Sequence, residues 1–586
     1  MTQLAERPAL VRDRLAAAGV DGFILPRGDE HLGEYVPACA ERLAWLTGFT
    51  GSAGLAILLR DAGAVFSDGR YVTQMADQVD DAIWQRRHVT LEPPSAWLAE
   101  HAKGLKVGYD PKLMSESMLD IVRAPGVELV PLDANPIDAV WADRPAPPAS
   151  RVTLQPDDLS GESSASKRAR LAGELKAAGE QAFVLCDTTS VAWLLNIRAD
   201  DVPCTPVALA FAILRDDASV DVFIDRNRLD EDVLASFGDS VRVHAPDHLE
   251  LSLDALCHKT VRLDRATTPQ WFAHRLETAA AHPKAGGDPC TLPKARKNAV
   301  EQEGARAAHA LDSVALVRFL YWFERHGTGQ HETALSAKLN AFRAQSPRYL
   351  GESFEAISGA GPNGAVIHYR AAEGRDRVLA ENEIYLIDSG GQYRSGTTDV
   401  TRTLWSGPGL PGNDVREAYT RVLKGNIALS RARFPAGTTG HRLDTLARMA
   451  LWQAGLDYDH GTGHGIGSYL SVHEGPCNIS AVPRPVALEP GMIISNEPGF
   501  YRPGAFGMRI ENLLLVRASS VAPEKFLEFE TLTFAPFARI LIAPELLSPD
   551  EVQWIDAYHA QVQRHLAGTL EPDVAEWLAR ACAPLA

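Results

Sequence analysis

Two β-rich stretches decide the fold of this chain: Glu383-Ile384-Tyr385-Leu386-Ile387-Asp388-Ser389-Gly390-Gly391 and Thr397-Thr398-Asp399-Val400-Thr401-Arg402-Thr403-Leu404. Both are rich in β-branched and aromatic residues, and residues 392–396 between them can form a turn. If the two strands pair about that turn, Asp388 and Asp399 lie nearly opposite each other, with Cβ atoms about 5 Å apart. Two like charges at that distance destabilise a sheet, so the pair indicates a site for a cation.

A second pair of carboxylates has the same arrangement further along the chain. The stretch Gly491–Glu497 leads through Pro503-Gly504 to Gly507–Asn512, and reflection about Gly504 places Glu497 opposite Glu511. Two hairpins that each present two carboxylates form a site rich in oxygen ligands. One such pair could be accidental, but two pairs favour a metal site.

The candidate nitrogen ligand is a histidine among glycines. His464 lies in Asp459-His460-Gly461-Thr462-Gly463-His464-Gly465-Ile466-Gly467, where the glycines allow the backbone to approach a ligand closely. A phosphate-binding loop is the rival interpretation. It fails because the lysine that follows such a loop is missing and the glycine spacing is not that of a dinucleotide-binding fingerprint.

The N-terminal half of the chain contains one α/β pattern twice. Each copy reads helix, strand, Trp-bearing segment, strand and strand, which predicts a duplicated domain. The matching segments are Gly22–Leu25, Leu43–Leu46 and Gly54–Leu59 in the first copy, and Ala182–Leu185, Val191–Leu194 and Ala208–Leu214 in the second.

Domain boundaries follow from composition and periodicity. A Pro- and Ala-rich linker at Pro145–Pro156 separates the two copies, and a long helix over Glu301–Glu324 opens a third domain. Beyond about Lys525, alternation predicts strands at Phe526–Phe529 and Ala538–Ile542, and then a helix that begins at Pro549 and ends near Leu566. The expected segments are 1–150, 151–293, 294–524 and 525–586.

Composition excludes several classes of protein. The chain has 586 residues, 75 acidic and 58 basic, and its net charge of -17 argues against nucleic acid as a partner. Neither a secretory signal nor an apolar run of membrane-spanning length is visible. The seven cysteines form no Cys-x-x-Cys pair, which suits a reducing compartment, so a cytoplasmic enzyme is expected.

With these motifs in place, the whole chain resembles the pita-bread metallopeptidases, and among them the three-domain Xaa-Pro aminopeptidases (aminopeptidase P). The resemblance implies an α/β (α+β) protein with two creatinase-like domains, a pita-bread catalytic domain and a C-terminal extension. It also implies two divalent ions, expected to be manganese with zinc or cobalt as alternatives. Their five ligands match Asp388, Asp399, His464, Glu497 and Glu511.

The resemblance assigns further roles as expectations. Glu497 would also shuttle the proton, and three histidines would contact the substrate and the transition state. Tyr501, Arg509 and, from the first domain, Arg70 would support or reach the bound peptide. The three histidines are His368, His460 and His473.

The expected reaction is hydrolysis of the N-terminal Xaa-Pro bond by a metal-activated hydroxide, on peptides with proline in the second position. A homodimer is expected from the family, and no membrane is involved. Two alternatives stay open: a prolidase that cleaves Xaa-Pro dipeptides, and a catalytically inactive pita-bread protein that only binds peptides or partners.

Overall fold

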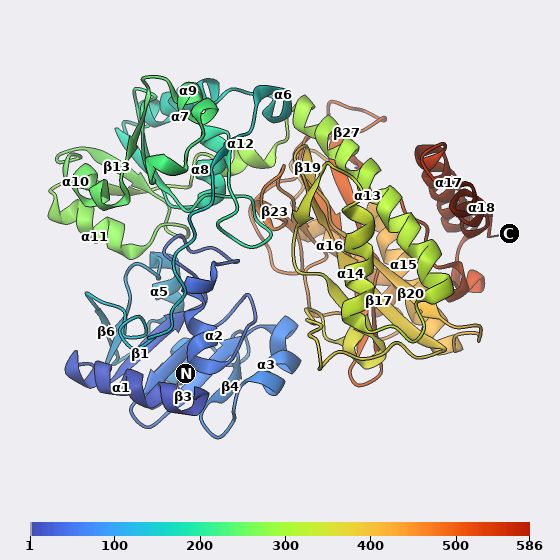
Figure 1. Cartoon of the computed structure of the whole chain (residues 1–586), viewed down its shortest axis with the longest axis horizontal. Helices are drawn as coiled ribbons and strands as arrows, with labels where there is room; N and C mark the ends of the chain where they lie inside the picture. The colour runs from blue at the N-terminus through green and yellow to red at the C-terminus, as the bar shows by residue number, and fades with distance from the viewer. Residues whose placement is uncertain (1–2, 586) are drawn as a thin grey trace. The chain divides into compact units, whose positions relative to one another are not determined.

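The chain is described by a computed structural model that covers residues 3–585. It divides into two compact units (Figure 1). The first unit extends to Asp157 and includes Glu162–Thr291. The second contains Asp158–Gly161, and Leu292 with the described residues after it. The expected mixed α/β class is confirmed.

The first unit contains two six-stranded sheets with the same strand order. The orders are β4-β3-β2-β1-β5-β6 and β12-β11-β10-β8-β13-β14. In each sheet, the strand that comes first along the chain pairs antiparallel with one neighbour and parallel with the other. The duplication predicted from the sequence is therefore confirmed. The strands are β1 Gly22–Pro26, β2 Leu55–Leu59, β3 Gly63–Ser67, β4 Gln85–His88, β5 Lys106–Tyr109, β6 Glu128–Pro131, β8 Ala182–Leu185, β10 Phe211–Arg215, β11 Val220–Phe223, β12 Val241–His244, β13 Thr260–Leu263 and β14 His282–Ala285.

Helices cover both faces of these sheets, and the β-strand period of two explains why. Phe23 and Leu25 belong to the core on one face of the first sheet, and Ile24 belongs to the core on the other face. Trp45 and Trp193 are buried at matching places, in α2 and α8. The helices are α1 Arg7–Ala17, α2 Arg42–Thr47, α3 Val72–Gln78, α4 Pro94–His101, α5 Glu116–Val122, α7 Ser164–Ala177, α8 Thr188–Leu195, α9 Glu231–Phe237, α10 Leu249–Asp254 and α11 Gln270–Thr278.

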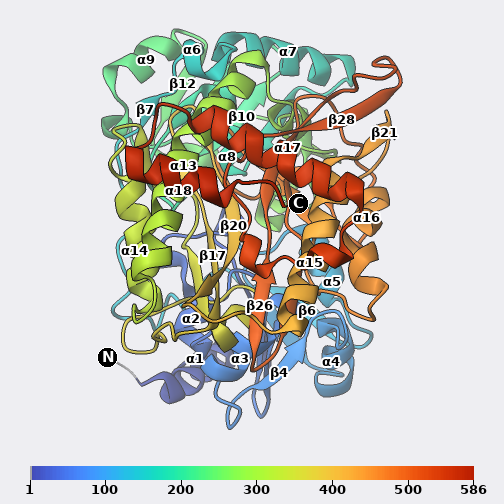
Figure 2. The ribbon, with the colours of Figure 1, turned by 90° about the vertical axis from the view of Figure 1, so that its right-hand side faces the viewer.

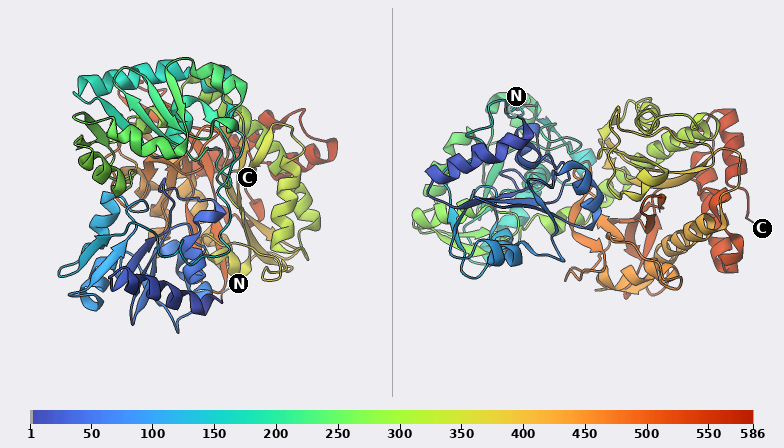
Figure 3. Two further views of the ribbon diagram at one scale, coloured as in Figure 1. Left: turned by 60° about the vertical axis from the view of Figure 1, so that its left-hand side comes forward. Right: turned by 90° about the horizontal axis from the view of Figure 1, so that it is seen from below.

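The second unit places helices outside a set of antiparallel strands. In Figure 2, α13 and α14 lie on one side, α15 and α16 on the other, and β17, β20 and β26 between them. The right panel of Figure 3 gives the same impression from below, with the yellow-green and orange helices on opposite sides of the strands. The helices are α13 Ala299–His326, α14 Glu332–Arg343, α15 Asn413–Ser430, α16 His441–Trp452, α17 Pro549–Leu566 and α18 Pro572–Ala581.

Most strands of the second unit form two sheets. The smaller has the order β16-β17-β20 and the larger the order β21-β28-β27-β24-β22-β23, while β25 and β26 form a hairpin of their own. The strands are β15 Tyr349–Glu352, β16 Ile357–Ala360, β17 Glu383–Ser389, β18 Gly391–Tyr393, β19 Gly396–Thr397, β20 Val400–Ser406, β21 Arg433–Pro435, β22 Gly463–Gly465, β23 Glu474–Ile479, β24 Ile493–Asn496, β25 Gly499–Arg502, β26 Phe506–Arg509, β27 Asn512–Ala518 and β28 Phe526–Thr531.

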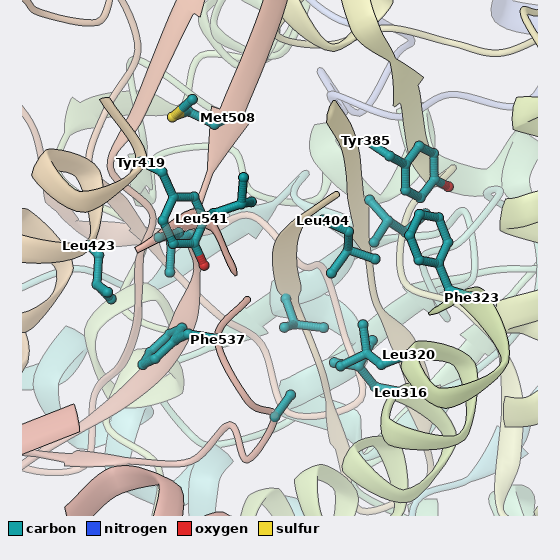
Figure 4. Packing of buried hydrophobic residues seen from close by; sticks show 14 of the residues in the cluster. Leu316, Leu320, Phe323, Tyr385, Leu404, Tyr419, Leu423, Met508, Phe537 and Leu541 are labelled. Atoms are coloured by element: carbon teal, nitrogen blue, oxygen red, sulfur yellow. The ribbon is translucent and has the colours of Figure 1, made fainter. Parts of the chain in front are cut away.

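The expected long helix is α13, and its start is fixed by a capping box. The side chain of Asn298 accepts hydrogen bonds from the backbone N–H groups of Val300 and Glu301, and the Glu301 side chain accepts one from Asn298. One face of α13 is buried against β17 and β20, as Figure 4 shows for Phe323 beside Tyr385. Those two rings stack with centroids 5.2 Å apart.

The C-terminal segment confirms two predictions and corrects one. A strand, β28, contains Phe526–Phe529, and α17 has the expected bounds. The strand expected at Ala538–Ile542 is wrong, because the chain forms a 3-10 turn at Arg539–Leu541. The apolar residues Leu541 and Ile542 are nevertheless buried in the core of the second unit, so burial and not strand pairing accounts for their composition. Across residues 3–585, no helix has both the length and the apolar character needed to span a membrane.

Candidate metal centre

The five predicted ligands lie at or beside the ends of strands of the second unit. Asp388 is near the end of β17, Asp399 directly precedes β20, and His464 is in β22. Glu497 follows β24, and Glu511 directly precedes β27. Residues that are distant in sequence thus come from neighbouring strands of two sheets.

The register predicted for the second hairpin is confirmed. Gly499 pairs with Arg509 in the β25–β26 hairpin, and Asn496 pairs with Asn512 where β24 meets β27. Both pairs have the symmetry centre at Gly504 that the sequence indicated. Glu497 and Glu511 lie between these pairs, at the junction where the two strands leave the larger sheet.

The register predicted for the first hairpin is wrong by two residues. Asp388 pairs with Thr401, not with Asp399, and Ser389 pairs with Val400. The turn is tighter than expected, because β18 and β19 continue the same pairing up to Tyr393 and Gly396. Asp388 and Asp399 are therefore diagonal neighbours on one face of the sheet, a separation that still allows two carboxylates to face a shared site.

Three of the five side chains form a compact group. Ligand atoms of Asp399, His464 and Glu511 all lie within 4.8 Å of one another. Glu497 adjoins this group, since its Oε1 is 3.4 Å from Nε2 of His464, which in turn is 3.6 Å from Oδ2 of Asp399. The structure therefore brings these residues together as predicted.

The orientation of His464 suits metal binding. Its Nδ1 is 3.1 Å from the carbonyl oxygen of Gly465, which makes Nδ1 the protonated nitrogen and Nε2 the nitrogen that carries the lone pair. Nε2 is the atom that faces Asp399 and Glu497. A metal-binding histidine characteristically donates its other N–H to a carbonyl or carboxylate in this way.

Asp388 is connected to His460 through Arg509 and Tyr501. Arg509 donates from Nη2 to Oδ2 of Asp388 and from Nη1 to the hydroxyl of Tyr501, both at 2.5 Å. The Tyr501 hydroxyl is 2.9 Å from Nε2 of His460, whose Nδ1 faces the carbonyl of Gly461 at 2.7 Å. Tyr501 therefore donates to His460, and a continuous set of hydrogen bonds connects Asp388 to that histidine.

The carboxylates strongly disfavour each other's charge in the absence of a cation. Burial, together with Glu511, Asp388 and Glu497, raises the pKa of Asp399 well above its usual range. Burial, together with Glu497 and Asp388, does the same to the pKa of Glu511. For Glu497, burial and Asp388 raise the pKa to about 7 against the opposing charge of Arg509. The single positive charge of Arg509 does not neutralise four carboxylates.

The donor set fits divalent cations. Oδ1 of Asp388, Oδ1 of Asp399 and Oε1 of Glu511 are buried and have no hydrogen-bond partner among the described residues. Buried polar atoms almost always have a partner, so three such oxygens in one place indicate a ligand. Carboxylate oxygens with one imidazole are the donors that hard divalent ions prefer.

Sequence reasoning missed three residues that hold the ligands in place. Thr401 donates to Oε2 of Glu511 at 2.8 Å, and Ser495 donates to Oε1 of Glu497 at 3.0 Å. Each lies two residues from a ligand along its strand, so the period of two could have identified both. Arg402 donates to the carbonyl oxygen of Glu511 at 2.7 Å, and no local pattern signals that contact.

The remaining predicted residues lie at different distances from this group. The ring of His473 is 4.4 Å from that of His464, centroid to centroid, in an edge-to-face arrangement. His368 follows the 3-10 segment Gly361–Ala365, which packs against β17 and β26. Arg70 belongs to the first unit, where it pairs with Asp68 at 2.8 Å, so its contact with a substrate stays a prediction.

Comparison with known proteins gives a consistent assignment along the chain. Residues 303–518 match the model of metallopeptidase family M24, and residues 525–585 match the C-terminal region of that peptidase. Residues 7–140 and 143–301 each match a creatinase/prolidase N-terminal domain.

Curated relatives match from end to end. The chain is 38% identical over 612 residues to the probable Xaa-Pro aminopeptidase P of Colletotrichum graminicola, with 99% of each chain covered. It is 37% identical over 615 residues to the probable Xaa-Pro aminopeptidase P of Tuber melanosporum, again with 99% of each chain covered.

Solved structures agree with the sequence comparison. X-prolyl aminopeptidase from Caenorhabditis elegans, described as a cytosolic enzyme with a di-nuclear active site, has a TM-score of 0.93 and 32% identity over 100% of both chains. The prolidase from Pyrococcus furiosus has a TM-score of 0.51 and 21% identity, and covers 62% of this chain and 99% of its own. That second likeness concerns the fold alone.

Proposed function

Because the chain belongs to metallopeptidase family M24, within the group of the Xaa-Pro aminopeptidases P, we infer that it hydrolyses the bond before proline at the N-terminus of peptides. It is a hydrolase and an aminopeptidase whose substrates carry proline in the second position. The observation that carries this assignment is the end-to-end match at 38% identity, joined to the carboxylate and histidine group at the strand junctions. The prolidase alternative matches in fold only, and over 62% of the chain.

The proposed organisation is two creatinase-like domains, a pita-bread catalytic domain and an extension. We keep the boundaries at 1–150, 151–293, 294–524 and 525–586. The repeated strand order of the first unit supports the division between the first two domains.

Two metal ions belong to this site, as the M24 family and the di-nuclear structural neighbour indicate. The proposed ligands are Asp388, Asp399, His464, Glu497 and Glu511, and the proposed metal is manganese. Four carboxylates and one imidazole support this choice, because oxygen-rich sites favour Mn²⁺ over metals that prefer thiolates. Zinc and cobalt are the alternatives.

When bound, the two ions would lower the pKa of the attacking water and polarise the scissile carbonyl. Glu497 then serves as the base: an Oε atom takes a proton from the attacking water and delivers it to the leaving proline nitrogen. Ser495 supports this role, since its hydroxyl bond to Oε1 at 3.0 Å fixes the carboxylate orientation.

The substrate contacts are assigned to residues around the group. His473 and His368 stabilise the tetrahedral intermediate or hold the proline carbonyl, and His460 is oriented for the same purpose by Tyr501 and Arg509. The bond of Tyr501 to His460 at 2.9 Å supports this assignment. Arg70 is proposed to reach the peptide. Selectivity for proline requires a pocket that fits the ring and that needs no N–H group from the substrate.

We assign the protein to the cytoplasm and expect it to act as a homodimer. The cytosolic description of the C. elegans enzyme supports the first point. The acidic net charge of -17 supports the absence of nucleic acid among its partners.

Hydrolysis of a small peptide panel tests the function. A tripeptide of the Arg-Pro-Pro type should lose its first residue, and the matching Xaa-Pro dipeptide should react more slowly. Glu497→Ala and His464→Ala should abolish hydrolysis without loss of fold, whereas the matched control Glu489→Ala, which removes a surface pair with Arg296, should not. Near-normal turnover by either site variant, or a preference for the dipeptide, would contradict the proposal.

A further inference from the structure

A buried amide on α15 contacts the backbone beside both metal glutamates. Helix α15 packs against β24, β25 and β26 and lies next to β26 in Figure 2. Asn426 projects from this helix and is completely buried. Its Nδ2 lies 2.9 Å from the carbonyl oxygen of Asn496 and 3.2 Å from that of Ile510. These two residues directly precede Glu497 and Glu511.

The contact is reciprocal. Nδ2 of Asn496 donates to the backbone carbonyl oxygen of Asn426 at 2.8 Å and to the hydroxyl of Ser430 at 3.0 Å. Ser430 lies one turn further along α15, so one strand end is attached to two successive turns of the helix. The attachment involves no side chain that has been assigned to catalysis.

The two acceptors fix the orientation of the Asn426 amide. If the amide were flipped, Oδ1 would face the two carbonyl oxygens. A carbonyl oxygen cannot donate a hydrogen bond to another carbonyl oxygen, so neither contact could form. Only Nδ2, with its two N–H groups, satisfies both carbonyls at once. Asn426 is therefore suited to hold two separate peptide groups at a defined spacing, which neither a hydroxyl nor an apolar side chain can do.

Strand pairing is sparse at this point. Regular pairing of β24 with β27 reaches Asn496 and Asn512, and pairing of β25 with β26 begins at Gly499 and Arg509. Glu497 and Glu511 lie between these two ladders, where the N–H of Ile510 donates to the carbonyl oxygen of Pro498 at 3.2 Å. The N–H groups of the two glutamates bond to the carbonyl oxygens of Thr462 and Thr401, so the Asn426 amide adds a contact that spans both glutamate-bearing strands. A metal site tolerates little change in the positions of its ligands, and residues behind the ligands commonly control that geometry.

We propose that Asn426 is a positioning residue for the metal centre, which sets the spacing of Glu497 and Glu511 by binding the peptide group that precedes each. The inference rests on the proposed function, because it needs a site that binds divalent ions. A purely structural role would make Asn426 one of many buried amides that stabilise the fold. The two roles differ in their effect on metal affinity.

The test compares metal affinity with the stability of the metal-free protein. The full chain and its variants are freed of metal with a chelator, titrated with Mn²⁺ alone by calorimetry, and melted without metal. Asn426→Ala should bind Mn²⁺ about 10- to 100-fold more weakly at one or both sites. Peptide hydrolysis by this variant should recover as Mn²⁺ is raised.

The matched control lies on the same helix. Thr420 is buried, and its hydroxyl accepts a hydrogen bond from the N–H of Ala543 at 2.8 Å, away from the glutamates. Thr420→Ala should lower the melting temperature of the metal-free protein to an extent comparable with Asn426→Ala, yet bind Mn²⁺ as the unmodified chain does.

The outcomes distinguish the positioning role of Asn426 from the proposed function of the chain. Equal Mn²⁺ affinity of Asn426→Ala and the unmodified chain overturns the positioning role while it leaves the proposed function intact. An unmodified chain that binds no Mn²⁺, and no Zn²⁺ or Co²⁺ in its place, overturns the proposed function. If Asn426→Ala does not fold, Asn426→Ser replaces it. The serine hydroxyl can donate to at most one of the two carbonyl oxygens. Unchanged Mn²⁺ affinity of Asn426→Ser would therefore also overturn the positioning role of Asn426.

Discussion

Arg509 donates a hydrogen bond from Nη2 to Oδ2 of Asp388 at 2.5 Å, inside a site that holds four carboxylates. Burial opposes the charge on Arg509, but Tyr501, Asp388, Glu497 and Glu511 keep its pKa well above the usual range. The guanidinium is thus a permanent positive charge at the edge of the metal centre. Nη1 of Arg509 also donates to the hydroxyl of Tyr501, which in turn donates to His460.

Tyr501→Phe should lower kcat/KM about tenfold or more, because it removes a hydrogen bond to a charged group, and such bonds contribute about 1.5–3 kcal/mol. His460 would lose the donor that orients its ring. Metal content should not change, since Tyr501 is not a ligand. Steady-state kinetics on an Xaa-Pro-Xaa peptide measures the effect. Tyr419→Phe, which removes a buried hydroxyl bonded to the N–H of Ala538, is the control and should leave kcat/KM unchanged.

Thr401→Val should weaken Mn²⁺ binding about 10- to 100-fold. Thr401 donates to Oε2 of Glu511 at 2.8 Å and accepts from Nε of Arg509 at 3.2 Å, and valine has the same shape without the hydroxyl. Titration of the metal-free variant measures the change. The control is Thr533→Val, which removes a bond to the N–H of Leu513 two residues beyond Glu511. Equal affinities of the two variants would show that the Thr401 hydroxyl does not position the glutamate.

Mn²⁺ binding should compete with protons below neutral pH. Burial raises the pKa of Glu497 to about 7 in the metal-free site, so this carboxyl carries a proton at lower pH and must release it when a cation binds. Affinity should therefore fall by up to about tenfold per pH unit for each proton displaced as the pH drops below 7. Calorimetry in buffers of different ionisation enthalpy measures the released protons. Binding that releases none between pH 5 and pH 7 would contradict the expectation.

The stability of the second unit should fall in mild acid because of His559. This residue is buried, its Nε2 accepts a hydrogen bond from the N–H of Phe537 at 3.2 Å, and burial lowers its pKa to about 4. Well above pH 6.5 the imidazole is neutral in both the folded and the unfolded chain, so it does not change the free energy of unfolding. As the pH falls, the unfolded chain takes up the proton first, so the free energy of unfolding decreases, by about 2 kcal/mol at pH 5.

His559→Gln tests this effect, because the amide oxygen can still accept from Phe537 but does not titrate. Denaturant unfolding of the second unit at pH 7 and pH 5 should show a larger loss for the unmodified chain than for the variant. The same loss in both proteins would mean that other groups cause the acid sensitivity.

The sequence predicted much of the site because turn chemistry fixed one register. Pro503-Gly504 defines a single centre for the second hairpin, and the pairing of Asn496 with Asn512 follows from it. The first hairpin lacked such a signal. Its true turn lies at Arg394-Ser395, between β18 and β19, and composition alone did not distinguish this centre from one a single residue earlier.

Other features depended on contacts that no local pattern reveals. Ala538–Ile542 alternates like a strand, but its apolar residues are buried in the core without strand pairing. Arg402 reaches both the carbonyl oxygen of Glu511 and the hydroxyl of Tyr558 in α17, and Asn426 reaches Asn496. These polar contacts join segments far apart in sequence, so periodicity carries no information about them.

Metal stoichiometry coupled to activity tests the central claim most directly. The purified chain, freed of metal and then titrated with Mn²⁺, should bind two ions per chain, and cleavage of an Arg-Pro-Pro peptide should be absent before the addition and appear with it. Glu511→Ala should fold but fail to reach this stoichiometry. A folded chain that takes up no divalent ion, or that cleaves the peptide at full rate after chelation, would contradict the account.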